Sequence, residues 1–291
     1  MNRVFGLLAL AVLPLLAACA PSGVNERQEP IASNGDGIVG GTEVSSSGRI
    51  AQLSGLLTLS NRRGRCTFSV LSSEWLLTAA HCVEEQKLEE MEAVFDVNVL
   101  DNQGRIDARN VRRIREVHVH PNYAQTMARL DQMQREAMAA GRELTSEEVD
   151  AVKDWGDMAL VRIEGKIPAK QRAVRLLPAE IPVRTGDSVV LAGYGITNGS
   201  LNTGSGILRE VQVKVAEGLW GTSEILFDQR EGRGACRGDS GGPAYFSYRG
   251  QLFLIGVTSR GVRDERNDCS QFAAYTSVRA HRNWLRQITG L

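Results

Sequence analysis

Residues 238–243 read Gly-Asp-Ser-Gly-Gly-Pro and place one hydroxyl side chain, Ser240, in a tight, glycine-rich turn. Small residues on both sides leave the hydroxyl open to a substrate carbonyl and let backbone N–H groups approach a developing oxyanion. A cluster of Gly, Ser and Pro is also typical of an ordinary turn. The segment alone therefore leaves two interpretations, a surface turn and a turn that holds a nucleophile.

A histidine and an aspartate, both far upstream in the chain, could activate such a serine. His81 lies in the sequence Thr-Ala-Ala-His-Cys after a strand-like Trp-Leu-Leu run, and Asp157 opens the run Asp-Met-Ala-Leu. A serine hydroxyl is a weak nucleophile at neutral pH and needs a base, commonly a histidine, to take its proton. An aspartate can then orient the imidazole and stabilise its charged form. Together the three residues predict acyl-transfer chemistry.

The elements that would position these groups are mainly short strands. β-type runs separated by turn formers follow one another from residue 38, among them 50–59, 94–100 and 272–276, and they predict an all-β sandwich or barrel. Residues 124–140 are instead rich in helix formers and end at Gly141, while Thr145 and Glu148 have the pattern of a capping box. We therefore expect a helical hairpin inserted into a β-protein. The tail, 277–289, has apolar residues at helical spacing.

Composition limits the class of protein. The 291 residues, 42% of them hydrophobic, can bury one large or two modest cores. The 34 basic and 34 acidic residues balance, with no basic tract, so nucleic acid is not an expected partner. His118 and His120 could share a strand face and bind a metal, but a turn at residues 120–123 is the favoured interpretation. The acidic run 84–92 could hold calcium, but a solvated charged face is favoured. No Cys-x-x-Cys pair occurs, and we expect neither a metal nor a cofactor.

The order His81, Asp157, Ser240, with its surrounding motifs, resembles the trypsin/chymotrypsin family of serine proteases. The resemblance covers about residues 38–289. It implies two packed six-stranded antiparallel β-barrels with a C-terminal helix, interrupted here by the helical insertion at about 124–153. It also implies a serine endopeptidase that acts on proteins or peptides, with an oxyanion hole formed by the N–H groups of Gly238 and Ser240. Ser259 matches the family serine that supports the aspartate.

The resemblance also bears on activation. Ile38 begins an Ile-Val-Gly-Gly sequence similar to the family's activation terminus. Cleavage before Ile38 would free an ammonium group that pairs with Asp239 and orders the oxyanion hole, so the chain is expected to be a zymogen. The preceding residue is Gly37, so the activating protease is not expected to be trypsin-like.

The primary specificity pocket follows from the same resemblance, which places Gly234 at its base and Gly261 and Ala273 on its walls. All three are small and uncharged, and we expect cleavage after apolar or aromatic residues. Nearby arginines could instead attract acidic residues, and one of them replaces the family's usual aromatic residue in the substrate-binding strand: Arg237, Arg260 and Arg263, of which Arg260 is the replacement.

The N-terminus has the features of an export signal. Arg3 precedes the apolar run 4–18, which is too short to span a membrane stably. The ending Leu-Ala-Ala-Cys resembles the lipobox of bacterial lipoproteins, in which Cys19 would carry lipid; ordinary signal-peptide cleavage beside Cys19 is the alternative. The resemblance implies a signal peptide at 1–18, an anchored linker or propeptide at 19–37 and a peptidase domain at 38–291. Ala20, rather than Asp, favours the outer membrane of a two-membrane envelope, and cleavage before Ile38 would release the domain.

Export also affects the cysteines. With Cys19 lipidated, four cysteines remain in an oxidising compartment and suggest two disulfides, with three connectivities open. The family resemblance implies one pairing, Cys66 with Cys82 and Cys236 with Cys269.

Two further alternatives concern function. The chain could be a catalytically silent family member that serves as an envelope binding or scaffold lipoprotein, although no triad residue is missing. The apolar side chains of the first inserted helix fall near one face and are expected to pack on the barrel, a lid or partner surface being the alternative: Met127, Leu130, Met133 and Met138.

Overall fold

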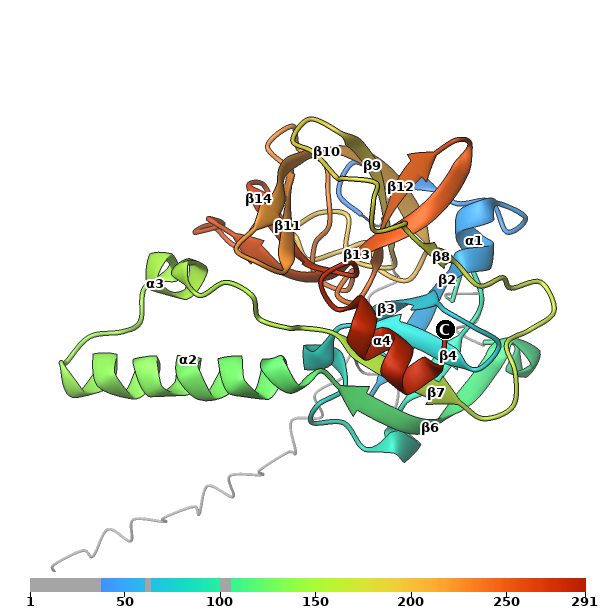
Figure 1. Cartoon of the computed structure of the whole chain (residues 1–291), viewed down its shortest axis with the longest axis horizontal. Coiled ribbons are helices and arrows are strands. Elements are labelled where there is room, and N and C mark those ends of the chain that lie inside the picture. Colours follow the sequence, from blue (N-terminus) through green and yellow to red (C-terminus); the bar gives the residue numbers. More distant parts are fainter. Residues whose placement is uncertain (1–37, 61–63, 100–105) are drawn as a thin grey trace, which may run out of the picture. The chain divides into compact units, whose positions relative to one another are not determined.

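A computed structural model of the chain describes residues 38–60, 64–99 and 106–291. Its first half is a closed six-stranded antiparallel barrel in which the strands follow the order β2-β3-β4-β7-β6-β5 (Figure 1). The strands are β2 (Ser54–Leu59), β3 (Gly64–Val70), β4 (Trp75–Thr78), β5 (Glu92–Val94), β6 (Val111–Val119) and β7 (Ala159–Ile163).

The second half repeats this architecture. Its strands follow the order β10-β11-β14-β13-β12-β9, and pairing of β9 with β10 closes the ring. They are β9 (Ser188–Gly193), β10 (Arg209–Trp220), β11 (Glu224–Asp228), β12 (Pro243–Tyr248), β13 (Gln251–Val262) and β14 (Phe272–Ser277). Two short strands attach outside the ring, β1 (Thr42–Glu43) on β10 and β8 (Arg175–Leu176) on β13. The expected pair of six-stranded barrels is thus confirmed.

The apolar core joins the barrels. The larger cluster of buried residues fills the first barrel and continues into β12 and β13 of the second through Tyr245, Leu254 and Val257. The hydroxyls of Ser54 and Tyr245 also hydrogen-bond across this boundary at 2.9 Å. A second cluster, which includes Ile38, Phe227 and Tyr275, fills the second barrel. Burial of this apolar surface is the main force that holds the two sheets in contact.

Helices and short 3₁₀ turns complete the fold. They are α1 (Arg49–Leu53), η1 (Ala80–Cys82), η2 (Leu88–Glu90), η3 (Ala108–Asn110), α2 (Pro121–Ala139), α3 (Ser146–Ala151) and α4 (Arg282–Thr289). The strand predicted over 50–59 is wrong at its start, because α1 precedes β2 there; a short, continuously buried apolar run does not reveal its period. The strand predicted over 94–100 is also wrong, since β5 ends at Val94. The tail helix begins only at Arg282, because β14 extends to Ser277.

Helices α2 and α3 form the inserted hairpin between β6 and β7, and α2 extends away from the barrels (Figure 1). Thr145 and Glu148 form the predicted capping box at the start of α3. Helix α2 starts earlier than predicted: the side chain of His120 accepts a hydrogen bond from the N–H of Asn122, and Pro121 occupies the first turn, where it needs no donor. His120 therefore caps a helix and does not lie in a turn.

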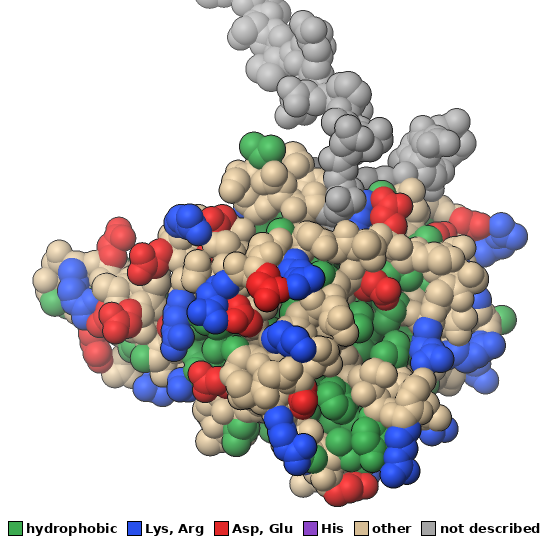
Figure 2. Space-filling view, turned by 90° about the horizontal axis from the view of Figure 1, so that it is seen from above, with side chains coloured by type: hydrophobic (Ala, Val, Ile, Leu, Met, Phe, Trp, Pro, Cys, Tyr) green, Lys and Arg blue, Asp and Glu red, His purple; other side chains and the backbone are tan. Residues whose placement is uncertain are grey.

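The hairpin packs on the barrel only near its base. Met127 contacts the larger apolar cluster, whereas Met138 is 64% exposed, so the expectation that this face packs on the barrel holds only at its start. Acidic and basic side chains are mixed over the projecting part of the molecule (Figure 2). Among the described helices, none combines the length and the hydropathy needed to cross a membrane.

Candidate active site

His81 and Asp157 are brought together by a pair of strands. His81 lies in η1 directly after β4, and Asp157 comes two residues before β7; β4 and β7 are paired, with Thr78 opposite Ala159. The Nδ1 atom of His81 lies 2.7 Å from the Oδ2 atom of Asp157, and the backbone N–H of His81 donates to Oδ1 at 3.0 Å. The carboxylate therefore holds the ring in an orientation with Nδ1 occupied and Nε2 directed elsewhere.

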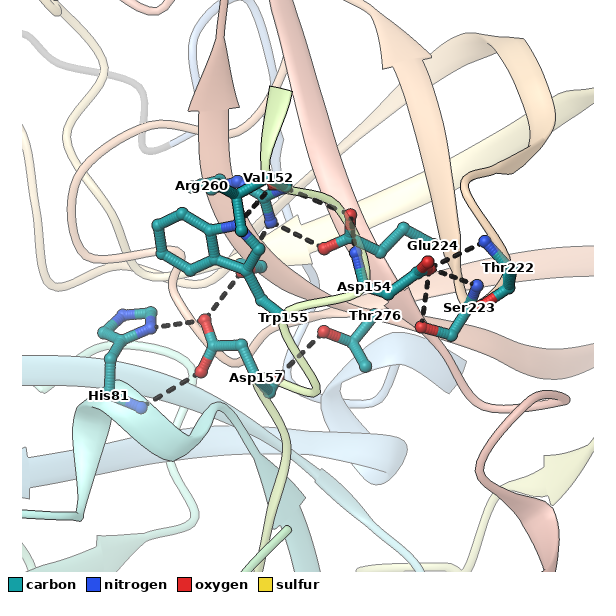
Figure 3. A network of polar contacts seen from close by, with 11 residues as sticks. His81, Val152, Asp154, Trp155, Asp157, Thr222, Ser223, Glu224, Arg260 and Thr276 are labelled. Carbon is teal, nitrogen blue, oxygen red and sulfur yellow. Dashed lines mark hydrogen bonds and ion pairs between the residues drawn. The ribbon is translucent and has the colours of Figure 1, made fainter. Parts of the chain in front are cut away.

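Asp157 is a buried carboxylate with a complete set of partners. Ser259 donates its hydroxyl to Oδ2 at 2.7 Å, and Thr276 donates to the backbone C=O of Asp157 at 2.9 Å (Figure 3). Desolvation would raise the pKa of Asp157, but the His81 imidazole and the hydrogen bonds outweigh it and lower that pKa. At His81, desolvation acts to lower the pKa, but the charge and hydrogen bond of the Asp157 carboxylate outweigh it, and the pKa of His81 is raised. The pair favours an anionic aspartate beside a basic imidazole.

The turn that carries Ser240 packs against the segment leading to His81. Gly241 has φ +78°, and a Cβ atom there would lie 2.0 Å from Oγ1 of Thr78 and 2.8 Å from the backbone N of Ala79. Only glycine fits so close to these atoms in this conformation. In the described part of the chain, neither Nε2 of His81 nor Oγ of Ser240 has a hydrogen-bond partner. Such catalytic contacts are often long in the absence of substrate.

The residue before the serine is also a buried carboxylate. Asp239 accepts the N–H of Gly195 through Oδ1 and the N–H of Cys236 through Oδ2, both at 2.8 Å. Desolvation raises the pKa of Asp239 to about 7, although these hydrogen bonds and the charge of Arg209 oppose the shift. Gly238, the residue before Asp239, has φ +93°. A Cβ atom on Gly238 would lie only 2.9 Å from the Cα atom of Gly195.

The segment that begins at Ile38 is inserted in the same region. Ile38 is fully buried among the apolar residues of the second barrel, and the C=O of Val39 accepts the N–H of Gly234 at 2.9 Å. The residue that follows the predicted activation terminus is therefore paired with the residue predicted at the pocket base. Cys19 and the linker lie outside the described residues.

The predicted pocket residues lie together, with one partner that the sequence did not indicate. Gly261 and Ala273 face each other across β13 and β14. A Cβ atom on Gly234 would lie 2.2 Å from Oε1 of Gln229, whose buried side chain bridges two backbone segments. Its amide donates to the C=O groups of Ala235 (3.1 Å) and Cys269 (3.0 Å), and its oxygen accepts the N–H of Ala235. No spacing rule singles out a glutamine in this role.

A second set of residues that sequence reasoning missed surrounds Arg260 (Figure 3). Its guanidinium contacts both oxygens of the buried Glu224, at 2.6 and 3.1 Å, and lies 4.1 Å from the centroid of the Trp155 ring. Glu224 also accepts the N–H of Asp154 at 3.0 Å. Arg260 thus fastens the segment that returns from the helical hairpin to Asp157. These residues are far apart in sequence, so only the fold reveals the cluster.

The cysteines pair as the family resemblance implied, Cys66 with Cys82 and Cys236 with Cys269. Among the described residues, one group of three potential metal ligands is close enough to share an ion, and it consists of His81 with the first of these disulfides. Oxidised sulfurs offer no thiolate, and His81 is engaged with Asp157. His118 and His120 have separate partners, Glu116 and His281.

Two packed β-barrels, with a His–Asp pair near a turn that carries a serine, are the architecture of chymotrypsin-type serine proteases. The sequence profile of trypsin matches residues 38–285, and the chain belongs to the trypsin family. Similar proteins include vitamin K-dependent protein C from Oryctolagus cuniculus, 27% identical over 79% of this chain and 48% of its own length. Transmembrane protease serine 11G from Rattus norvegicus is 26% identical over 78% and 50%, and transmembrane protease serine 11B from Homo sapiens 26% over 79% and 50%. The chain thus spans about half the length of the curated relatives it matches.

Proposed function

We propose that the protein is a serine endopeptidase in which His81, Asp157 and Ser240 form the catalytic triad. The observation that carries this proposal is the 2.7 Å contact between His81 and Asp157 beside the turn of Ser240. His81 would remove the proton of the Ser240 hydroxyl as it attacks a peptide carbonyl, and would return that proton to the leaving amine. The N–H groups of Gly238 and Ser240 would stabilise the oxyanion.

A fluorophosphonate probe tests this proposal directly, because it labels an activated serine without requiring the natural substrate. The protein cut before Ile38 should be labelled and should hydrolyse a peptide ester, and Ser240→Ala should lose both properties. Loss of the nucleophile is expected to reduce kcat by about 10⁶-fold if the triad acts as a unit. An unlabelled protein with all three residues in place would favour the alternative, a catalytically silent binding or scaffold lipoprotein.

We also propose that cleavage before Ile38 activates the enzyme. The support is a buried Asp239 whose pKa is raised to about 7, since a carboxyl in that state gains from a nearby cation. A new ammonium on Ile38 would supply one, and would order the turn of Gly238 and Ser240. The residue before the cut is Gly37, which does not indicate a trypsin-like activating protease. N-terminal sequencing of the active form tests this: an active form that retains residues 20–37 would contradict it.

For substrate preference, we propose cleavage after uncharged residues, apolar or aromatic. The three small residues at the pocket positions support this, because none of them offers a carboxylate to a basic side chain. Hydrolysis of a peptide panel that varies only the residue before the cut is the test. A strong preference for Arg or Lys would contradict the proposal. A preference for Asp or Glu would favour Arg237 and Arg263 as specificity residues, since Arg260 is paired with Glu224.

Finally, we propose that the protein is a lipoprotein of a bacterial cell envelope, in the outer membrane where there are two membranes, and that activation releases the domain. The support is the Leu-Ala-Ala-Cys sequence at Cys19 after a short apolar run. Metabolic labelling with a fatty acid should mark the precursor, and Cys19→Ala should abolish the label. A labelled precursor that yields an unlabelled soluble protease would support release; an unlabelled precursor would favour ordinary signal cleavage.

A further inference from the structure

One edge of β13 is uncovered next to the serine turn. Strand β12 pairs with β13 only as far as Val257, whereas β14 accompanies it to Val262. Thr258 completes the covered part, because its N–H and C=O bind the backbone of Gly242 and Gly241, each at 2.9 Å. Beyond it, within the ranges that the structure describes, no strand covers residues 259–262 on that side. A backbone edge therefore begins beside Ser240 and is free to pair with an extended peptide.

The backbone groups of Gly261 point to this open side. The peptide N–H that follows Val262, the last residue of β13, is that of Arg263, and it donates to a side chain on this side. Because peptide N–H groups alternate in direction along a strand, the N–H of Gly261, two peptides earlier, points to the same side. A Cβ atom on Gly261 would have its nearest neighbours at 3.5 Å, an ordinary contact distance. A peptide that extends from Ser240 along β13 therefore reaches Gly261 about three residues from the cut, at about 3.3 Å per residue.

Helix α3 closes this edge at its far end. The acceptor for the N–H of Arg263 is Oδ2 of Asp150, at 2.7 Å. Asp150 is half-buried, and desolvation raises its pKa against the effects of that hydrogen bond and of the charges on Arg260 and Arg263. The next outward-pointing backbone donor after Gly261 is thus already occupied by the inserted hairpin.

Two cavities meet at Asp150. One of about 270 Å³ is lined by Val149, Asp150 and Gly261, among others. The second, of about 500 Å³, is lined by Asp150, Lys153 and Trp220, among others. Asp150 borders both, so the free space beside Gly261 is bounded by α3.

We propose that α3, through Asp150, ends the substrate cleft on the side preceding the cut, so that the enzyme selects chains that end or turn away about three residues before the scissile bond. This inference rests on the proposed peptidase function. It makes Asp150 a residue that determines substrate length and the inserted hairpin part of the substrate site. A short N-terminal segment or a tight exposed loop would be accepted, and a long extended strand would have to displace α3.

The test is a length series. Acetylated peptides with the same residues at the cut and two, three, four or six residues before it are hydrolysed by the full chain after cleavage before Ile38. For the native protein, kcat/KM should rise from two to three residues and then remain flat or fall. In Asp150→Ala the freed N–H can pair with substrate, and the six-residue peptide should gain about fivefold to tenfold over the three-residue one.

Two variants control for indirect effects. Asp150→Asn keeps an oxygen acceptor for Arg263 and should retain the native profile. Asp131→Ala removes the same charge from an exposed position of α2 and should also retain it. Equal gains with length in the native protein, or identical profiles for Asp150→Ala and Asp131→Ala, would overturn the proposal.

Binding separates this proposal from the catalytic one. In full chains that carry Ser240→Ala, the dissociation constants of the same peptides give the length comparison without turnover. Affinity that stops improving at three residues, and improves to six only when Asp150 is also replaced by Ala, supports the inference even if no peptide is cut. Affinity that rises steadily with length in the presence of Asp150 contradicts it, whatever the activity.

Discussion

Asp157 and Asp239 are two buried aspartates of the candidate site, and they differ in the groups that contact them. Asp157 accepts hydrogen bonds from a ring nitrogen, a hydroxyl and a backbone N–H. Asp239 accepts two backbone N–H groups. Both are almost completely removed from solvent, yet the pKa of the first lies below its usual value and that of the second is about 7.

The contrast between the two residues identifies the factor that sets the charge of a buried carboxyl in this protein. Desolvation acts on both residues and opposes ionisation. At Asp157 the His81 imidazole in direct contact and the hydrogen bonds to the carboxylate reverse the effect of desolvation, whereas at Asp239 two backbone N–H donors and the charge of Arg209 do not. The first site therefore already has its partner in the uncut chain. Within the described part of the chain no cation is in hydrogen-bond contact with the second, and the proposed activation would provide one.

The largest test of this comparison removes the anionic partner of His81. Asp157→Asn keeps the size of the side chain but takes away its charge and favours the wrong imidazole tautomer, so kcat should fall by about 10⁴-fold. The measurement is hydrolysis of a short peptide ester by the protein cut before Ile38, with thermal unfolding as a check that the fold is retained. A decrease of less than tenfold would mean that Asp157 does not orient the base.

The second test concerns the charge of Asp239 in the uncut chain. Its folded pKa of about 7 lies above the unfolded value of about 3.9, so between these pH values the folded state holds a proton that the unfolded state has lost. Stability should therefore fall as pH rises, by about 4 kcal/mol in total at about 1.4 kcal/mol per pH unit, and level off above pH 7. Urea unfolding of chains with and without Asp239→Asn, all carrying Ser240→Ala, measures the difference.

The cut protein provides the control for that experiment. An ammonium on Ile38 would keep Asp239 ionised, and the decrease between pH 4 and 7 should disappear. Parallel stability curves for the uncut chain and its Asp239→Asn variant would show that burial alone does not perturb this carboxyl.

A smaller effect is expected at the hydroxyl that supports Asp157. Ser259→Ala removes one hydrogen bond to a charged group, which makes the carboxylate more basic and lets it hold the proton of His81 more tightly. We expect kcat/KM to fall about tenfold and the acid limb of the pH–rate profile to move to higher pH. Ser259→Thr retains a hydroxyl and serves as the control; an unchanged profile in the alanine variant would leave the hydrogen bond without a catalytic role.

The smallest effect belongs to a contact with the backbone of Asp157. Thr276→Val removes the hydroxyl that donates to its C=O while preserving the side-chain shape, and should cost about 1 kcal/mol of stability. Because the carboxylate is not touched, the pH–rate profile should not move. Denaturant unfolding and the profile of the cut protein measure the two quantities, and a shifted profile would mean that Thr276 acts on the charge.

Much of the site could be predicted because its chemistry is local. The turn of Ser240 needs glycine at 241 to approach Thr78 and Ala79, and such a requirement can be recognised in the sequence as a conspicuous glycine. The capping box of α3 was readable for the same reason, since Thr145 and Glu148 satisfy each other within one turn. By contrast, the apolar run at 50–59 contains a helix and a strand that bury the same kind of residue, and its pattern favours neither.

Side-chain contacts between residues that are distant in the sequence could not be predicted. Arg260 finds Glu224 and Trp155, and Asp150 finds the backbone of Arg263, only because β10, β11 and β13 bring these segments to the hairpin. Side-chain partners of this kind depend on register and on the path of a loop, and neither is encoded in residue spacing.

From the amino-acid sequence alone, the candidate reacting groups, the two-barrel class and, through the family resemblance, the cysteine pairs could be predicted, because the family's motifs are short and local. The pairing of Asp157, and the absence of a cation in hydrogen-bond contact with Asp239 among the described residues, became apparent only from the three-dimensional structure, since the pKa of a buried carboxyl depends on atoms supplied from distant parts of the chain. The tertiary structure also placed Asp150 at the end of the open edge of β13. Its reach results from the geometry of the hairpin and not from any local motif.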